Sequence, residues 1–199
     1  MYNEYKKARD LAWKTLIDCG ITVLPVNLTQ IADHYNIILI PYSQSTVAQK
    51  LDLKQDGFTL KRNGKYIVYY KDSYNQRARF TIAHELGHIL LGHIDNPDSV
   101  NEYAANIFAR DLLMPAIVLK KINVISAYEI SQLCDVSKAA AEIRLERLQK
   151  LSKRNKFFTS FLEIKVYKNF KNYIKQMRWN ICQLIKMKKE VLIMQSLGT

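Results

Sequence analysis

The sequence predicts an α+β fold, in which a small β-sheet packs on one face of a helix and further helices follow. Three observations predict this fold. Two strand-like runs, 56–60 and 65–70, flank Asn63-Gly64, a dipeptide typical of tight hairpin turns. The segment after the hairpin has helical periodicity and carries two histidines four residues apart. Beyond residue 99, apolar residues recur mainly at spacings of three and four, as in amphipathic helices.

The elements before the hairpin are two helices and a strand. Residues 2–18 have a helical apolar face, so we expect a helix there. A second, shorter helix is expected over 29–35, with Asn27 or Thr29 as its N-cap. The run 37–42 is continuously apolar, which indicates a strand.

The helix after the hairpin carries the motif His84-Glu85-Leu86-Gly87-His88. Two histidines four apart stand one turn above each other on one helix face, so their ring nitrogens can reach one metal ion. Glu85 can point at a water bound to that metal and accept its proton. This is the H-E-x-x-H signature of zinc peptidases. The alternative is a buried histidine pair used for packing, which the motif disfavours.

A catalytic zinc site has three protein ligands and one open position, so a further ligand is needed downstream. His93 lies about half a turn round the helix from His84, so we expect it to pack beside the site or support it. Asp95 and Asp98 lie too near the helix end to fold back easily. Glu102 is favoured, because a turn and a second helix would return it to the histidines.

Two interpretations of Glu102 remain open from spacing alone. Asn106 falls on the same face as Glu102 and can hold the far N–H of a histidine, which supports a metal-binding role for this face. Ser99-Val100-Asn101-Glu102 also fits a capping box, in which the glutamate reaches back to the start of its own helix.

Residues 79–88 and 102–115 together resemble the ImmA/IrrE family of metallopeptidases. The second motif of that family reads E-x-x-A-N-x-F-A-x-x-L-L-M-P, and every fixed position is present from Glu102 to Pro115. The resemblance covers about residues 1–150. It implies that Glu102 joins His84 and His88 as the third ligand to one Zn²⁺ per chain. A small sheet that frames a catalytic helix is also what zincin-like, gluzincin-type peptidases use.

We therefore expect three segments: a zinc metallopeptidase domain at 1–125, a helix-turn-helix-like helical hairpin at 126–151, and a basic helical tail at 152–199. Ser137 is a suitable N-cap for the second helix of the hairpin. The first turn of that helix offers only Lys138 as an exposed contact for DNA bases. A hairpin that packs on the peptidase domain is therefore favoured over a DNA reader.

Positive charge is concentrated in the tail. Residues 1–149 hold 18 Lys and Arg against 16 Asp and Glu, whereas residues 150–199 hold 12 against 2. Apolar residues repeat at helical spacing between these charges: Phe170, Tyr173, Ile174, Met177, Ile181, Leu184 and Ile185. The tail is either a helix with a solvated basic face or a contact for an anionic partner, such as nucleic acid, an acidic protein surface or an anionic membrane.

The cysteines and the hydropathy indicate a cytoplasmic protein. Cys19, Cys134 and Cys182 are odd in number and widely spaced, so reduced thiols are expected and a cysteine zinc site is not. The sequence has no signal peptide and no apolar run near eighteen residues, so no transmembrane segment is expected.

The resemblance implies a site-specific, zinc-dependent endopeptidase that cleaves a protein substrate. The implied substrate is a helix-turn-helix transcriptional repressor, whose cleavage relieves repression in a mobile element, prophage or stress response. The alternative is a metal- or nucleic-acid-binding regulator, or an antitoxin-like binding protein, with an auxiliary peptidase site. Glu85 favours the enzyme, because metal binding does not require it.

Overall fold

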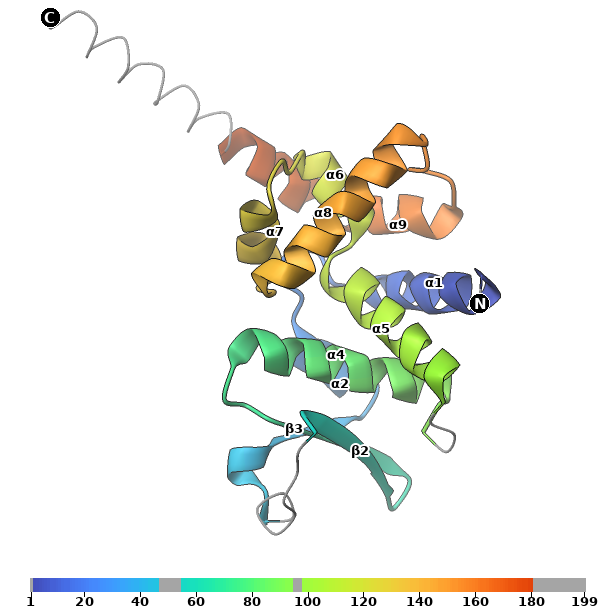
Figure 1. Ribbon diagram of the computed structural model, residues 1–199, viewed down its shortest axis with the longest axis vertical. Coiled ribbons are helices and arrows are strands. Elements are labelled where there is room, and N and C mark those ends of the chain that lie inside the picture. The colour runs from blue at the N-terminus through green and yellow to red at the C-terminus, as the bar shows by residue number, and fades with distance from the viewer. Residues whose placement is uncertain (1, 47–54, 95–97, 181–199) are drawn as a thin grey trace, which may run out of the picture.

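The structure, a computed structural model, describes residues 2–46, 55–94 and 98–180 and has a mixed α+β fold (Figure 1). A further helical run at 171–180 follows the last labelled helix. The elements are, in order, α1 Tyr2–Asp18, α2 Leu28–His34, β1 Ile38–Pro41, the 3-10 turn η1 Tyr42–Gln44, β2 Gly57–Arg62, β3 Lys65–Tyr70, α4 Asn75–Leu91, α5 Ser99–Leu113, α6 Ala116–Ile122, α7 Ala127–Cys134, α8 Lys138–Lys153 and α9 Phe161–Asn169.

The three described strands form one sheet in the order β1-β3-β2. β1 runs parallel to β3, with Ile38 opposite Ile67, and β2 pairs antiparallel with β3. Asn63 and Gly64 join β2 to β3 with φ of 51° and 74°. Positive φ at both central residues is what a type I′ hairpin turn requires, so the predicted hairpin is confirmed.

The sheet packs on α4, which lies between it and helices α1 and α5, whereas α2 contacts both α4 and β1 (Figure 1). Val68 of β3 is buried in this contact, whereas the Tyr69 ring lies on the opposite face of the sheet and stacks on Phe58. Gly57 allows β2 to approach α4 closely, because a Cβ at this position would lie 2.3 Å from Cγ2 of Thr81 and 2.9 Å from the Tyr69 carbonyl oxygen. No other residue fits this position without displacing the strand.

Helix α5 packs against both α4 and α1 and forms the centre of the helical layer. Phe108 and Leu112 of α5 are fully buried, as is Leu16 of α1. Gly87 permits the contact with α4, because a Cβ there would lie 3.0 Å from Cδ1 of Phe108 and 3.3 Å from Cα of Ala105. The small residue of the H-E-x-x-H segment thus sets the distance between the two helices.

Helices α7 and α8 form a hairpin whose ends are capped by side chains. Ser126 and Glu129 form a capping box at the start of α7, and the Ser137 hydroxyl accepts the Ala140 N–H at the start of α8, as expected. Asp135 in the turn accepts a 2.8 Å hydrogen bond from the Asn75 side chain of α4. The hairpin is therefore tied to the start of the motif-bearing helix.

The described part of the basic tail joins the main core. Helix α9 contacts α1 and α6. Val166, Phe170 and Ile174 are buried in the same cluster as the residues of α1 and α5, whereas the lysines of this segment are exposed. The rest of the predicted apolar face (Ile181, Leu184 and Ile185) lies outside the described residues.

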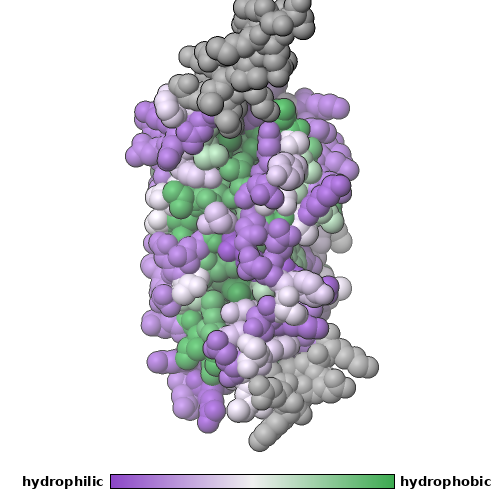
Figure 2. Space-filling model, turned by 90° about the vertical axis from the view of Figure 1, so that its left-hand side faces the viewer, coloured by the Kyte–Doolittle hydropathy of each residue, from purple (hydrophilic) through white to green (hydrophobic). Residues whose placement is uncertain are grey.

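The surface combines hydrophilic areas with a hydrophobic stripe, which runs along the face shown in Figure 2. In the segments that the structure describes, no helix has both the length and the apolar composition needed to cross a membrane.

Candidate metal centre

The structure brings His84, His88 and Glu102 together. The two Nε2 atoms of the histidines lie 3.0 Å apart on consecutive turns of α4. One Glu102 carboxylate oxygen lies 3.3 Å from Nε2 of His84, and the other lies 3.2 Å from Nε2 of His88. All three ligand atoms fall within 4.8 Å of one another. The Glu102 side chain is half exposed, so the cluster opens towards solvent.

The backbone between the two helices explains how Glu102 returns to the histidines. Gly92 ends α4 with φ of 78°, and the next N–H, that of His93, donates to the His88 carbonyl. This left-handed ending closes the helix. Asp98 then caps α5 by accepting the N–H groups of Val100 and Asn101.

The alternative capping role of Glu102 is wrong. In the capping box that spacing allowed, Ser99 would be the N-cap, but Ser99 is already the first residue of α5 and Asp98 is its N-cap. Glu102 then stands one residue too far along the helix for the box. Its carboxylate faces the histidines instead.

The donor set fits a divalent metal ion. Oδ1 of Asn106 lies 3.1 Å from Nδ1 of His84, which favours the tautomer with its proton on Nδ1 and leaves the Nε2 lone pair facing Glu102. Burial lowers the pKa of His88, and neighbouring His84 lowers it further. Two imidazoles and one carboxylate directed at a common point suit zinc and other divalent ions of similar preference.

Glu85 is positioned by the sheet. The Thr59 hydroxyl of β2 donates a 2.6 Å hydrogen bond to Oε2 of Glu85. Burial raises the pKa of Glu85, the Thr59 hydrogen bond and His84 oppose this rise, and Glu102 adds to it. A carboxylate with a raised pKa beside a metal site is suited to accept and return a proton.

Thr59 and Tyr42 did not emerge from the sequence as site residues. Burial raises the pKa of Tyr42, and the negative charge of Glu85 raises it further. The Tyr42 hydroxyl therefore interacts electrostatically with Glu85. Thr59 lies two residues after Gly57, so both residues face the same side of β2. This alternation is the only feature of the sequence that points to Thr59. It identifies a partner for Glu85 only once the contact between β2 and α4 is known.

His93 lies outside the three-residue cluster. Its ring is buried, with its centroid 5.9 Å from that of His88. Burial lowers the pKa of His93, and within the described chain its Nδ1 has no hydrogen-bond partner. It packs beside His88. Asp95 lies outside the described residues.

Comparison with known proteins identifies the family. No curated protein matches the chain significantly. A family model described as the IrrE N-terminal-like domain, Peptidase M78, matches residues 27–146. This is more than half of the chain, and it includes both helices of the metal cluster. The chain therefore belongs to the ImmA/IrrE family of metallopeptidases.

Proposed function

We propose that the chain is a zinc-dependent endopeptidase that binds one Zn²⁺ through His84, His88 and Glu102. The observation that carries the proposal is the convergence of these three side chains next to a half-buried carboxylate, Glu85. Asn106 supports it, because its bond to the far nitrogen of His84 is the contact that orients ligating histidines. In this proposal His93 supports the site only by packing on His88.

Glu85 is the proposed general base. Bound zinc would polarise the scissile carbonyl and make water acidic enough to lose a proton near neutral pH. Glu85 accepts the proton of the attacking water and passes it to the leaving amine. The hydrogen bond from Thr59 supports this role, because it fixes one carboxylate oxygen and leaves the other available.

Strand β2 is the proposed binding edge for the substrate. Among the strands described, β2 is at the outside of the sheet, and it carries Thr59 beside Glu85. An extended peptide that pairs with this edge would place its backbone next to the metal cluster. A substrate-mimicking peptide should shift the backbone amide NMR signals of residues 56–70. Unmoved signals at saturating peptide would exclude this binding mode.

The proposed substrate is a helix-turn-helix repressor in the cytoplasm, cleaved at one site to relieve repression in a mobile element, prophage or stress response. Family membership supports a protein substrate. In this scheme, residues 1–125 form a zincin-like, gluzincin-type catalytic unit and 126–151 form a helix-turn-helix-like hairpin. The basic segment 152–199 contacts an acidic protein surface or nearby nucleic acid.

The proposal is tested by comparing new protein N-termini, by mass spectrometry, in host cells that express wild type or Glu85→Gln. We expect a few new termini with wild type only, inside one DNA-binding regulator. Glu85→Gln keeps the shape and the metal ligands, so it is the matched inactive control. If both proteins are folded and metal-loaded, and purified regulator stays intact with wild type, the peptidase proposal is wrong.

The second candidate function is a metal-dependent regulator that works by binding alone, as an antitoxin-like protein does. The concentration of positive charge in the C-terminal segment favours it. A gel shift on DNA that depends on metal loading and is unaffected by Glu85→Gln would support this function. Substrate cleavage that is lost in Glu85→Gln would support the peptidase.

A further inference from the structure

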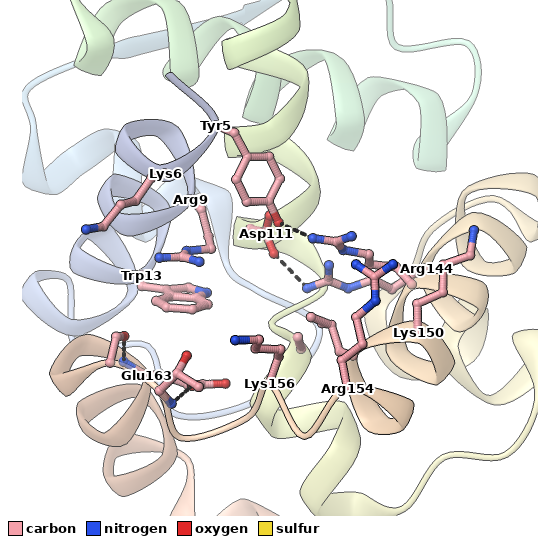
Figure 3. A pocket seen from close by; sticks show the side chains of 15 residues that line it. Tyr5, Lys6, Arg9, Trp13, Asp111, Arg144, Lys150, Arg154, Lys156 and Glu163 are labelled. Carbon is pink, nitrogen blue, oxygen red and sulfur yellow. Dashed lines mark hydrogen bonds and ion pairs between the residues drawn. The ribbon is translucent and has the colours of Figure 1, made fainter. Parts of the chain in front are cut away.

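A cavity lies on the opposite side of α5 from the group formed by His84, His88 and Glu102. It has a volume of about 470 Å³ and is walled by α1, α8 and the segment that leads into α9 (Figure 3). Asp111 at its floor is nine residues along α5 from Glu102, a separation of about 14 Å along the helix. The cavity is therefore distinct from the site of the proposed peptidase, and what it binds does not depend on that function.

The cavity wall is strongly basic. Seven lysines and arginines line it, against two acidic residues, Asp111 and Glu163. Arg144, Arg147 and Lys150 recur at intervals of three along α8, so one face of this helix supplies much of the charge. Arg9 on α1 lines the opposite wall. Like charges held in one cavity repel each other, and the repulsion falls when an anion enters.

The two acids do not neutralise this wall. Asp111 is fully engaged at the floor, where it accepts a 2.8 Å bond from Arg144 and a 2.5 Å bond from Arg110. Glu163 is buried and caps its own helix by accepting the Thr159 N–H. Within the described chain, no carboxylate pairs with the remaining basic side chains of the rim: Lys6, Arg154 and Lys156.

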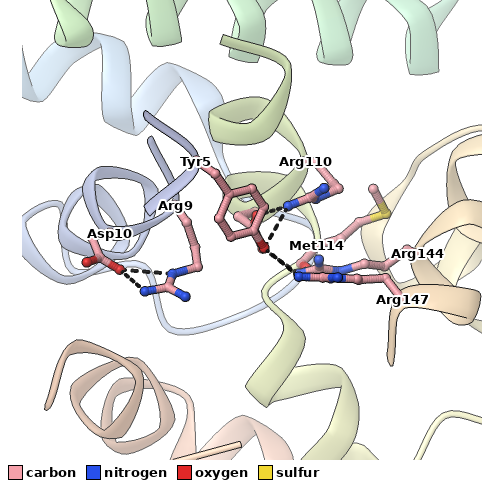
Figure 4. A network of polar contacts seen from close by, with 8 residues as sticks. Tyr5, Arg9, Asp10, Arg110, Met114, Arg144 and Arg147 are labelled. Atoms are coloured by element: carbon pink, nitrogen blue, oxygen red, sulfur yellow. Dashed lines mark hydrogen bonds and ion pairs between the residues drawn. The ribbon is translucent and has the colours of Figure 1, made fainter. Parts of the chain in front are cut away.

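Aromatic side chains contact several of the arginines around this cavity. The Tyr5 hydroxyl accepts hydrogen bonds from both Arg110 and Arg147, at 3.4 and 3.1 Å (Figure 4). The guanidinium of Arg9 lies over the Trp13 ring, 4.6 Å from its centroid. Arg9 also pairs with Asp10, and Arg110 pairs with Asp111. Arg147 has no carboxylate partner among the described residues, so its charge remains available to a ligand.

The cavity has more hydrogen-bond donors than acceptors. Three buried nitrogen atoms on its wall have no acceptor among the described residues: Trp13 Nε1, Arg144 Nε and Arg147 Nε. Buried donors without acceptors are costly, and native proteins seldom retain several together. An excess of donors and positive charge is expected where the acceptors arrive with a bound ligand.

We infer that this cavity is a binding site for a small, multiply charged phosphate compound. Arginine forks bind phosphate oxygens bidentately, and lysines add point charges. The volume lies in the usual range for small-molecule sites. A nucleic acid strand is a less suitable ligand, because the cavity has a buried floor of Arg144 and Asp111 rather than an open basic track.

Tripolyphosphate binding to the full-length, metal-loaded chain tests the inference. Isothermal titration calorimetry should give one site per chain with micromolar affinity. The double variant Arg154→Gln/Lys156→Gln removes two exposed rim charges and should weaken binding about tenfold or more. Lys168→Gln/Lys171→Gln is the matched control, because it removes two exposed charges that do not line the cavity.

Tryptophan fluorescence gives a local readout. The chain has two tryptophans, and the second, Trp179, is 63% exposed, so Trp179→Phe leaves Trp13 as the reporter on the cavity wall. Its emission should change on titration and saturate with the calorimetric affinity. Metal chelation by the probe would be the same in both double variants and would leave Trp13 emission unchanged.

Three results would overturn the inference. The first is the absence of saturable binding at physiological salt. The second is equal weakening by the two double variants, which would indicate a general effect of net charge. The third is tighter binding of single-stranded oligonucleotides than of tripolyphosphate, with affinity that rises with strand length, which would indicate a nucleic acid surface.

Discussion

The Thr59 hydroxyl donates a 2.6 Å hydrogen bond to the Glu85 carboxylate and so links the sheet to helix α4. The two residues are 26 positions apart, and their contact depends on Gly57, which lets β2 lie against α4. One carboxylate oxygen is thereby held, while burial raises the pKa of the group. In this family member, the sheet therefore positions the proposed general base.

Thr59→Val should reduce turnover without reducing zinc affinity. Valine has nearly the shape of threonine but cannot donate, so the carboxylate loses its anchor. A hydrogen bond to a charged group contributes about 1.5–3 kcal/mol, which corresponds to a loss of roughly 10- to 100-fold in kcat if it acts fully in the transition state. Thr29→Val, on the exposed surface of α2, is the control. If Thr59→Val and Thr29→Val have the same kcat, Thr59 does not contribute to catalysis.

Asn106→Ala should weaken zinc binding by about 10- to 100-fold, because it removes the partner that orients His84. Glu102→Gln should weaken it further by replacing an anionic ligand with a neutral one. Competition with a chromogenic zinc chelator measures both affinities. Glu146→Gln, an exposed change on α8, should leave the affinity as in wild type. If Glu102→Gln binds zinc as wild type does, the third ligand is another residue.

Gly57→Ala should destabilise the fold by about 1–3 kcal/mol, as overpacking does, because the new methyl would meet Cγ2 of Thr81 at 2.3 Å. Thr81→Ser removes that atom, so the double variant should recover part of the loss. Some cost should remain from the Tyr69 carbonyl oxygen, 2.9 Å from the new methyl. Urea denaturation of the four proteins in this cycle measures the coupling, and strictly additive effects would contradict the contact.

Features with local causes could be predicted from the sequence. Asn63-Gly64 fixes its own backbone conformation, and Ser137 caps a helix through an N–H three residues away. The four-residue spacing of His84 and His88 likewise dictates a shared helix face. In each case the interacting groups lie within a few residues of each other, so the local sequence determines the structure without help from long-range packing.

Features that depend on long-range packing could not be predicted in this way. The sequence suggests Ser99 as the N-cap of a capping box, whereas in the structure Asp98 is the N-cap and Ser99 is the first residue of α5. Thr59 meets Glu85 only because of strand register and the approach of β2 to α4. The basic cavity joins residues from opposite ends of the chain, such as Tyr5 and Arg147, which no local pattern connects.

Cys19 and Cys134 should resist alkylation in the folded protein. Burial raises the pKa of Cys19 to about 11 and that of Cys134 to about 12, so very little reactive thiolate exists at pH 8. Peptide mass spectrometry after a short iodoacetamide treatment should find both unmodified, and both should react after denaturation. Modification of Cys134 in the native state as rapid as in urea would show that the α7–α8 region opens easily.

Asp111→Asn should destabilise the protein by about 3–5 kcal/mol at neutral pH, because Arg144 would remain buried without its anionic partner. Burial alone would raise the pKa of Asp111, but Arg144 and Arg110 together hold it below its usual value. Asp111 therefore binds a proton more readily in the unfolded chain than in the folded protein. Its contribution to the free energy of unfolding is fully present above about pH 4 and is lost as the pH falls through the folded pKa.

The deficit of Asp111→Asn relative to wild type should accordingly be constant between about pH 5 and 7 and shrink below about pH 4. Chemical denaturation over this pH range measures it. Asp33→Asn, at an exposed site on α2, should cost less than about 0.5 kcal/mol throughout. A deficit that grows as the pH falls would mean that Asp111 is already protonated in the native state. The ion pair that closes the floor of the basic cavity would then not exist.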